Sequence, residues 1–302
     1  MKPLQTSSGH LLADRRADYA QMLFASGSHA AAAELLLGAL ELAPDWSFGW
    51  FRLGEFHEAA GDLVQAVEAW RMALKLDPAD RVGASLKLQL AGAEPADSVL
   101  SSGFVEALFD QYAGTFDRSL VEKLGYRAPE LLLDAIRAEA PGRFDLVIDL
   151  GCGTGLMGER LRPFAGRLEG YDISAEMLRK AGSKKIYDRL VKADLLTMRY
   201  GGDPAGLVVA ADVFIYLGAL ETVFALAAAM LAPGGLFAFS VERHTGEGDF
   251  ALRPTRRHAH AEPYIRRRLE EAGFAVLSLD GRVIRQDHGE PVEGLVAVAR
   301  RS

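Results

Sequence analysis

An apolar run that ends in an acid and is followed by three glycines stands near the middle of the chain. The run covers residues 146–150 and contains Asp149, and Gly151, Gly153 and Gly155 follow at alternate positions. Such a run is typical of a buried strand in a parallel sheet. Glycines let the backbone turn sharply and let a ligand approach it, because no Cβ stands in the way. The stretch predicts a strand, a nucleotide-binding loop and then a helix.

Asp149 discriminates between two kinds of nucleotide. Gly153, Gly155 and Gly158 also fit the dinucleotide pattern Gly-x-Gly-x-x-Gly, which alone is a weak signal. A carboxylate at the end of the strand would face the pyrophosphate of NAD, and like charges repel each other. The same carboxylate suits S-adenosyl-L-methionine, which carries an ammonium and a sulfonium and no phosphate. A glycine-rich turn that binds nothing is the remaining alternative.

The order acid, any residue, Gly-x-Gly-x-Gly resembles motif I of the class I S-adenosylmethionine-dependent methyltransferases. Asp149, Gly151, Gly153 and Gly155 occupy its fixed positions, with Cys152 inside the loop. The resemblance extends in order over residues 104–302. It implies an α/β fold, a Rossmann-like seven-stranded sheet with an antiparallel last strand, and S-adenosyl-L-methionine as the cofactor.

Later acids follow predicted strands and extend the resemblance. Asp172 lies 21 residues after Gly151, where an acid would accept hydrogen bonds from ribose hydroxyls. The resemblance places Ile173 and Met177 beside the adenine.

Two more predicted strands end near residues 194 and 212. The resemblance implies that Asp194 accepts from the adenine amino group, with Leu195 beside the ring. Asp212 and Tyr216 follow the apolar run that begins at Gly206. Because ligands of open α/β sheets bind at the carboxyl ends of the strands, these two should lie near the methyl group and the acceptor.

Two helices are predicted within residues 103–140, before the first strand. The pattern Phe-Asp-x-Tyr-Ala-x-x-Phe-Asp over 109–117 resembles the helix that folds over the cofactor in small class I methyltransferases. Tyr112 and Phe116 would then contact the cofactor or substrate. Arg127 could form a charge-assisted bond with the methionine carboxylate. Packing in the core is the alternative for the aromatic side chains.

The segment 243–261 follows the fifth predicted strand and is rich in cationic side chains. Loops at this end of a sheet build substrate sites. Cationic groups would suit a carboxylate or phosphate on the acceptor, and a histidine could serve as general base. A solvated basic loop is the alternative. The predicted substrate-binding residues, besides Tyr216, are Arg256, His258, His260 and Tyr264.

His258 and His260 are also the candidates for catalysis, although the reaction does not require an acid or base. A sulfonium is already activated, so holding the acceptor in line with the S–CH₃ bond is much of the catalysis. No metal site is predicted, because His258-x-His260 has no carboxylate or thiol partner at a known ligand spacing.

The N-terminal third repeats with an offset of 34 residues. Pro44 aligns with Pro78 and Gly27 with Gly61, which defines copies at 13–46 and 47–80. The pattern resembles the tetratricopeptide repeat, a pair of antiparallel helices. Such arrays bind a peptide or protein, or pack on their own chain or a second subunit. The predicted domains are a flexible tail (1–12), a helical repeat domain (13–92), a linker (93–102) and a methyltransferase domain (103–302).

Composition limits the partners and the cellular compartment that can be expected. The 302 residues carry a formal charge of −7, so no nucleic-acid partner is expected. Cys152 is the single cysteine, which fits a reducing cytoplasm. No signal peptide and no membrane span are predicted, and a homo-oligomer is possible.

Two other functions remain open. One is a non-catalytic module that binds S-adenosylmethionine or another metabolite and signals through the repeats. The other is an NAD-dependent oxidoreductase, which Asp149 opposes.

Overall fold

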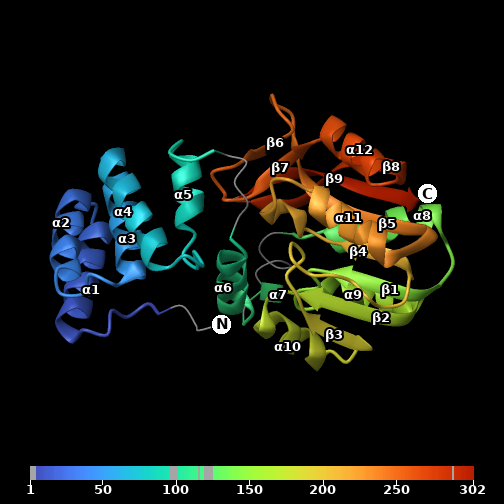
Figure 1. The fold of residues 1–302 in the computed structure, drawn as a ribbon, viewed down its shortest axis with the longest axis horizontal. Helices are drawn as coiled ribbons and strands as arrows, with labels where there is room; N and C mark the ends of the chain where they lie inside the picture. The colour runs from blue at the N-terminus through green and yellow to red at the C-terminus, as the bar shows by residue number, and fades with distance from the viewer. Residues whose placement is uncertain (1–4, 96–100, 115, 119–124, 288) are drawn as a thin grey trace. The chain divides into compact units, whose positions relative to one another are not determined.

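The computed structural model describes residues 5–95, 101–114, 116–118, 125–287 and 289–302. The chain divides into two compact units, residues 1–107 and 108–302, and each is described by itself (Figure 1). The division falls inside helix α6 (Ser102–Tyr112).

The first unit is a stack of helices. It contains α1 (Leu11–Ala25), α2 (His29–Leu40), α3 (Ser47–Ala59), α4 (Leu63–Leu76) and α5 (Ala84–Leu90). The predicted helical pairs are confirmed, and so is one more helix that the sequence predicts over residues 81–91.

Small residues allow these helices to approach closely. A Cβ on Gly54 of α3 would lie 2.2 Å from the Trp70 Nε1 of α4, so only glycine fits there. Ala66 and Ala73 of α4 are fully buried beside them. Gly27 and Gly61 have φ of 85° and 83° and form equivalent turns between the helices of each copy.

The second unit is built on a mixed sheet. Its parallel part has the order β3-β2-β1-β4-β5, with β1 Phe144–Leu150, β2 Ala165–Asp172, β3 Arg189–Lys192, β4 Ala205–Ala210 and β5 Leu231–His244. β9 (Glu290–Arg301) runs antiparallel between β5 and β8 (Phe274–Asp287). The predicted α/β fold with an antiparallel last strand is confirmed.

Helices cover both faces of this sheet. One apolar core joins β1, β4 and β5 to α11 (Glu221–Met230) and α12 (Glu262–Glu271). The other joins the opposite face to α8 (Ala128–Glu139) and α9 (Leu156–Leu161). The alternating side chains of β1 explain the division, because Ile148 belongs to the first core and Val147 to the second. Helix α10 (Ala175–Ser183) follows β2.

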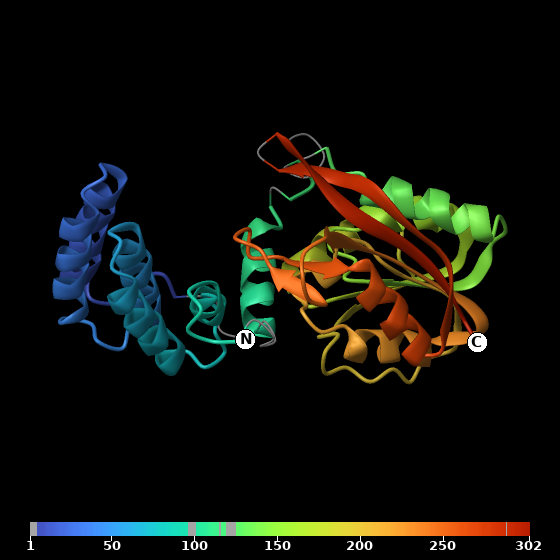
Figure 2. The ribbon, with the colours of Figure 1, turned by 90° about the horizontal axis from the view of Figure 1, so that it is seen from above.

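Two features differ from the sequence prediction. The segment after β5 forms the short strands β6 (Phe250–Leu252) and β7 (His258–Ala261), and β7 extends the sheet beyond β5. A loop was predicted there, because alternating small and basic residues carry no apolar run. In addition, the sequence predicts a strand over residues 274–279, but β8 continues to Asp287 and forms a long hairpin with β9, drawn in red in Figure 2.

Candidate functional site

The glycine loop after β1 has the geometry that the sequence predicts. Gly151, Gly153 and Gly155 have φ of 62°, 53° and 92°, which side-chain-bearing residues rarely adopt. A Cβ on Gly151 would lie 2.4 Å from Val213 Cγ2. The Cys152 backbone N–H donates to the Tyr171 carbonyl of β2 at 3.0 Å. The loop is therefore a fixed cradle between the ends of β1, β2 and β4.

Asp172, the last residue of β2, binds the backbone of the glycine loop. Its Oδ2 accepts from the Gly153 backbone N–H at 2.8 Å, and its Oδ1 accepts from the Ser174 N–H at 2.8 Å. Burial raises the pKa of Asp172 to about 6, and the two backbone donors oppose that rise. Met177 is fully buried in α10, where its backbone N–H donates to the N-cap Ser174.

Asp149 lies inside the fold beneath the loop. Its Oδ2 accepts a hydrogen bond of 2.6 Å from the Tyr187 hydroxyl, while its Oδ1 is buried with no partner among the described residues. Burial raises the pKa of Asp149 to about 7. Sequence reasoning missed Tyr187, which closes over Gly158, where a Cβ would lie 2.1 Å from the Tyr187 Oη.

Helices α6 and α7 (Phe116–Arg118) approach the loop through two aspartates. The Asp110 Oδ1 accepts from the Ser174 hydroxyl at 2.6 Å, and Asp117 accepts from the Thr154 hydroxyl. The Phe116 ring lies 3.9 Å from the position of a Cβ on Gly153. The predicted lid segment therefore contacts the glycine loop, and its aspartates, which the sequence reasoning passed over, make the polar contacts.

Two other predicted lid residues, Tyr112 and Arg127, are exposed to solvent. The Tyr112 side chain is 52% exposed. Arg127 is exposed, and its backbone N–H donates to the Ile284 carbonyl at 2.9 Å, so it ties the start of α8 to β8. Residues 119–124 of the predicted lid region (103–140) lie outside the described residues.

A buried ion-pair cluster stands at the carboxyl ends of β4 and β5. The Arg285 Nη1 lies 2.9 Å from both Asp212 carboxylate oxygens, and its Nη2 donates to Glu242. Asp212 has φ of 59°, and its backbone N–H donates to the Ser240 hydroxyl at 2.9 Å. Sequence reasoning missed Arg285, because the strand predicted over residues 274–279 ends before it.

Two tyrosines belong to the surroundings of Asp212. The Tyr216 ring meets Phe109 edge-on at 5.2 Å. Burial raises the pKa of both Tyr126 and Tyr216, and the charge of Asp212 adds to the rise. Both hydroxyls therefore stay protonated at neutral pH.

The histidines of β7 lie in a buried ring cluster. His258 and His260 pack around Phe250, and His260 also stacks on Tyr264. The His260 Nε2 lies 3.0 Å from the Gly218 carbonyl, and the Tyr264 hydroxyl accepts from the Leu220 N–H at 2.9 Å. Burial lowers the pKa of both histidines to about 4, so both are neutral at pH 7. The structure does not bring these three side chains to the glycine loop, and their predicted roles stay predictions.

The remaining predicted residues occupy turns. Asp194 follows β3 and its Oδ1 accepts from the Leu196 N–H at 2.9 Å, while Leu195 packs at the margin of the first core. Arg256 has φ of 62° in the turn that joins β6 to β7. Ile173 stands next to Asp172 at the end of β2.

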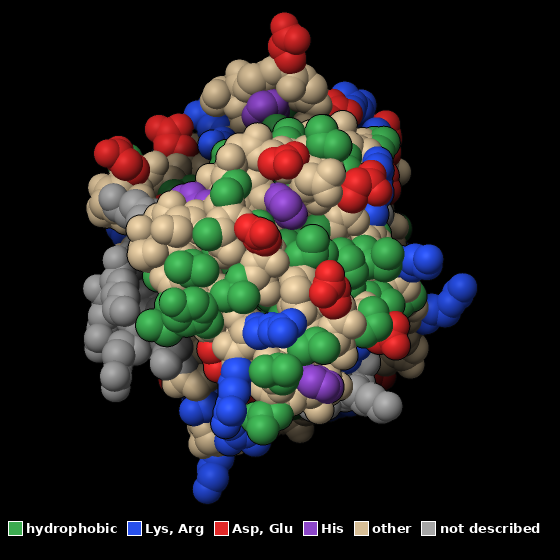
Figure 3. All heavy atoms as spheres, turned by 90° about the vertical axis from the view of Figure 1, so that its left-hand side faces the viewer, with side chains coloured by type: hydrophobic (Ala, Val, Ile, Leu, Met, Phe, Trp, Pro, Cys, Tyr) green, Lys and Arg blue, Asp and Glu red, His purple; other side chains and the backbone are tan. Residues whose placement is uncertain are grey.

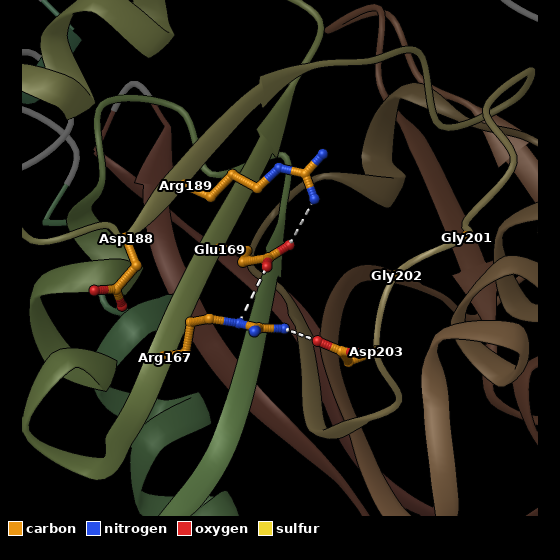
Figure 4. Close-up of a pocket in the computed structure, with 7 residues that line it drawn as sticks. All are labelled: Arg167, Glu169, Asp188, Arg189, Gly201, Gly202 and Asp203. Atoms are coloured by element: carbon orange, nitrogen blue, oxygen red, sulfur yellow. Dashed lines mark hydrogen bonds and ion pairs between the residues drawn. The ribbon is translucent and has the colours of Figure 1, made fainter.

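A second polar site lies at the edge of the sheet, in a pocket of about 490 Å³. Its charged side chains pair with one another, as Figure 4 shows for Glu169 between Arg167 and Arg189, and Asp203 against Arg167. Because these charges are compensated, the pocket lacks the unpaired carboxylate oxygen of the glycine-loop site. Within the described part of the chain, no group of three or more His, Cys, Asp or Glu side chains could hold a metal ion.

The sheet order, the glycine loop and the acid at the end of β2 are similar to those of methyltransferase domains. A family model described as a methyltransferase domain matches residues 147–235, and a tetratricopeptide repeat model matches residues 47–80. No helix among the described residues is long and apolar enough to cross a membrane.

Two curated proteins are similar to parts of this chain. Methyltransferase-like protein 27 from Homo sapiens is 38% identical over 85 residues, which are 27% of this chain and 34% of that protein. The malonyl-[acyl-carrier protein] O-methyltransferase of Enterobacter lignolyticus (strain SCF1) is 31% identical over 108 residues, 35% of this chain and 43% of that protein. The chain thus spans less than half the length of these curated relatives.

Solved structures agree with the fold. An S-adenosylmethionine-dependent methyltransferase from Clostridium acetobutylicum ATCC 824 superposes with a TM-score of 0.50 at 18% identity, over 65% of this chain and 99% of that one. A putative Haloferax volcanii methyltransferase in complex with its Trm112 activator gives 0.50 at 19% identity, over 64% and 96%. At this level of identity the likeness shows the fold.

Proposed function

We propose that the chain is an S-adenosyl-L-methionine-dependent methyltransferase whose acceptor is a small molecule or a protein. The observation that carries this proposal is the cradle of Gly151, Gly153 and Gly155, bounded by the buried carboxylates of Asp149 and Asp172. The fit to the cofactor is supported by two details. A Cβ on Gly153 would meet no atom nearer than the Phe116 ring at 3.9 Å, and Asp149 keeps one buried carboxylate oxygen with no partner among the described residues.

The cofactor supplies an activated methyl group, and the residues of this chain bind and orient it. Asp172 holds the Gly153 N–H and has lone pairs left for the ribose hydroxyls. The buried acid Asp149 favours a cationic ligand over a pyrophosphate. Phe116 lies against the loop from the lid. Adenine contacts are proposed for Ile173, Met177, Asp194 and Leu195, which belong to the segments that follow β2 and β3.

Calorimetric titration tests the cofactor. S-adenosylhomocysteine is expected to bind the purified chain with micromolar affinity, and NADH is expected not to bind, because the pyrophosphate would meet Asp149. No binding of S-adenosylhomocysteine would overturn the proposal, and binding of NADH alone would favour an oxidoreductase. Binding without turnover of any acceptor would favour the non-catalytic sensor.

The Asp172→Ala variant is expected to bind S-adenosylhomocysteine at least about tenfold more weakly, since ribose contacts and the anchor of the Gly153 N–H are lost together. The same titration measures the effect. Asp203→Ala, which removes an exposed carboxylate at the sheet edge, is the matched control and should leave the affinity unchanged. Equal affinities of the two variants would remove Asp172 from the site.

For the first unit, a protein partner and self-association are both proposed. Exposed apolar side chains support them: Leu11, Tyr19 and Met22 of α1 are 69%, 58% and 66% exposed. Figure 3 shows hydrophobic side chains spread over the face that carries α1 and α2. Light scattering on the purified full chain distinguishes these two hypotheses. Self-association into a dimer would double the measured mass, whereas a chain that binds a different protein would have the mass of the monomer. A cytoplasmic location stays a prediction that rests on the cysteine usage.

A further inference from the structure

The ion-pair cluster at the ends of β4 and β5 carries an excess of negative charge. Arg285 is 1% exposed and Glu242 3% exposed, and together with Asp212 they place two carboxylates around one guanidinium. The outer Arg253 lies 3.7 Å from Glu242, but its own side chain is 45% exposed, so water screens its charge. The buried part therefore has a net charge of −1.

Asp212 is the member of this cluster that faces outward. Its side chain is 12% exposed, against 1% for Arg285 and 4% for Glu242. The next residue, Val213, touches Gly151 of the glycine loop. Asp212 therefore stands next to a residue of the loop contact, and Arg285, itself held by Glu242, binds the Asp212 carboxylate from inside the fold.

The chemistry of this carboxylate restricts what it can bind. An ionised carboxylate only accepts hydrogen bonds, and each Asp212 oxygen keeps a lone pair beyond its bond to Arg285. A ligand group placed here must donate a hydrogen bond, and a carboxylate acceptor would be repelled. The neighbouring Tyr126 and Tyr216 are protonated and uncharged, and Arg257, the cation beside Tyr216, is paired with Asp287 at 3.6 Å.

A hydroxyl, a thiol and an amine are hydrogen-bond donors that can accept a methyl group. A hydroxyl or a thiol must lose its proton to attack, and a carboxylate already bound by a guanidinium is a poor base. The net negative charge attracts the cationic form of an amine, which releases one proton to water and then attacks as the neutral amine with its own lone pair. These two considerations favour nitrogen.

We propose that the methyl acceptor is an amine whose N–H is held by Asp212, with Arg285 and Glu242 as positioning residues. This inference rests on the proposed methyltransferase function. The amine nitrogen forms the new N–CH₃ bond, and the S–CH₃ bonding pair stays on sulfur, so the sulfonium becomes a thioether. The methylated nitrogen then loses its extra proton to water. The relative that methylates oxygen in malonyl-[acyl-carrier protein] would differ from this chain in the acceptor atom.

Sinefungin tests the inference, because it carries an amine-bearing carbon where the cofactor carries its S–CH₃ group. It therefore presents a cationic N–H donor where the acceptor nitrogen and the methyl group meet. By calorimetry at pH 7.5, the wild-type chain is expected to bind sinefungin at least about tenfold more tightly than S-adenosylhomocysteine, which lacks that amine.

The variant Asp212→Asn should lose this preference. The ratio of the two affinities is expected to fall to within about threefold of one, with the affinity for S-adenosylhomocysteine changed less than about twofold. Asparagine tolerates the left-handed backbone of residue 212, so the fold should persist. Glu242→Gln should lower the ratio at least about threefold, since it removes the excess charge. Asp280→Asn, an exposed position on β8, is the matched control and should keep the wild-type ratio.

Each outcome decides between the two proposals. If S-adenosylhomocysteine binds but sinefungin binds no better, the amine proposal is wrong and the methyltransferase proposal stands. An unchanged preference in both Asp212→Asn and Glu242→Gln also overturns it. If neither compound binds, the proposed function itself fails.

Discussion

Replacement of Arg285 by methionine is expected to lower the free energy of unfolding by about 3–5 kcal/mol, because it leaves two buried carboxylates without their cation. Asp212 and Glu242 both depend on the Arg285 guanidinium for their charge-assisted bonds. Although burial disfavours the charged form of Arg285, the two carboxylates hold its pKa above the usual value. Urea unfolding of the full chain, followed by circular dichroism, measures the loss.

A control variant on the same strand and a compensating variant in the same cluster accompany Arg285→Met. Arg282 lies on β8 with its side chain 54% exposed, so Arg282→Met should change stability by less than about 0.5 kcal/mol. Adding Asp212→Asn and Glu242→Gln to Arg285→Met should recover most of the loss, since no unpaired charge then remains. Equal effects of Arg285→Met and Arg282→Met would show that the cluster contributes nothing to stability.

In the ligand-free chain, replacement of Asp149 by asparagine is expected to raise stability at pH 8. Burial raises the pKa of this carboxyl from 3.8 to about 7, with the Tyr187 hydrogen bond opposing the rise and Asp172 adding to it. Between pH 4 and pH 7 the unfolded chain has released this proton and the folded chain retains it, so the contribution of Asp149 to stability falls as pH rises. The gain from asparagine at pH 8 is about 4 kcal/mol at most.

Urea unfolding at pH 4.5 and at pH 8 checks this expectation. The variant and the wild type should have similar stability at the lower pH, and the variant should be more stable at the higher one. Asp145→Asn, at an exposed position of the same strand, should not change the pH dependence. The variant should also bind S-adenosylhomocysteine more weakly, because the carboxylate that favours a cation is gone. If the variant is no more stable than the wild type at pH 8, then burial does not raise the pKa of Asp149 in the folded chain.

The sequence predicted what depends on local patterns. Glycines at alternate positions required the positive φ angles that Gly151 and Gly153 have. The repeat offset predicted helical pairs with equivalent turns at Gly27 and Gly61, which have φ of 85° and 83°, and the acid at the end of β2 lies on the loop as expected. Each of these depends on neighbours within one βα unit or one helical pair.

The site residues that the sequence did not predict depend on contacts between segments far apart in the chain, which no local pattern shows. Arg285 meets Asp212 across 73 positions of the chain, and Tyr187 meets Asp149 across 38. His258 and His260 are predicted from the sequence to bind the substrate or to act as a general base in a loop after the fifth strand. They are instead buried beside Phe250, because the loop folds into a strand that adds to the sheet.

Cys152 makes this protein convenient for spectroscopy. It is the single cysteine of the chain and is 5% exposed, and burial raises the pKa of its thiol well above the usual range. A thiol that stays protonated reacts slowly with alkylating reagents. A cysteine introduced on the surface of either unit would thus be modified selectively, and a pair of such sites would accept donor and acceptor dyes without removal of the native residue.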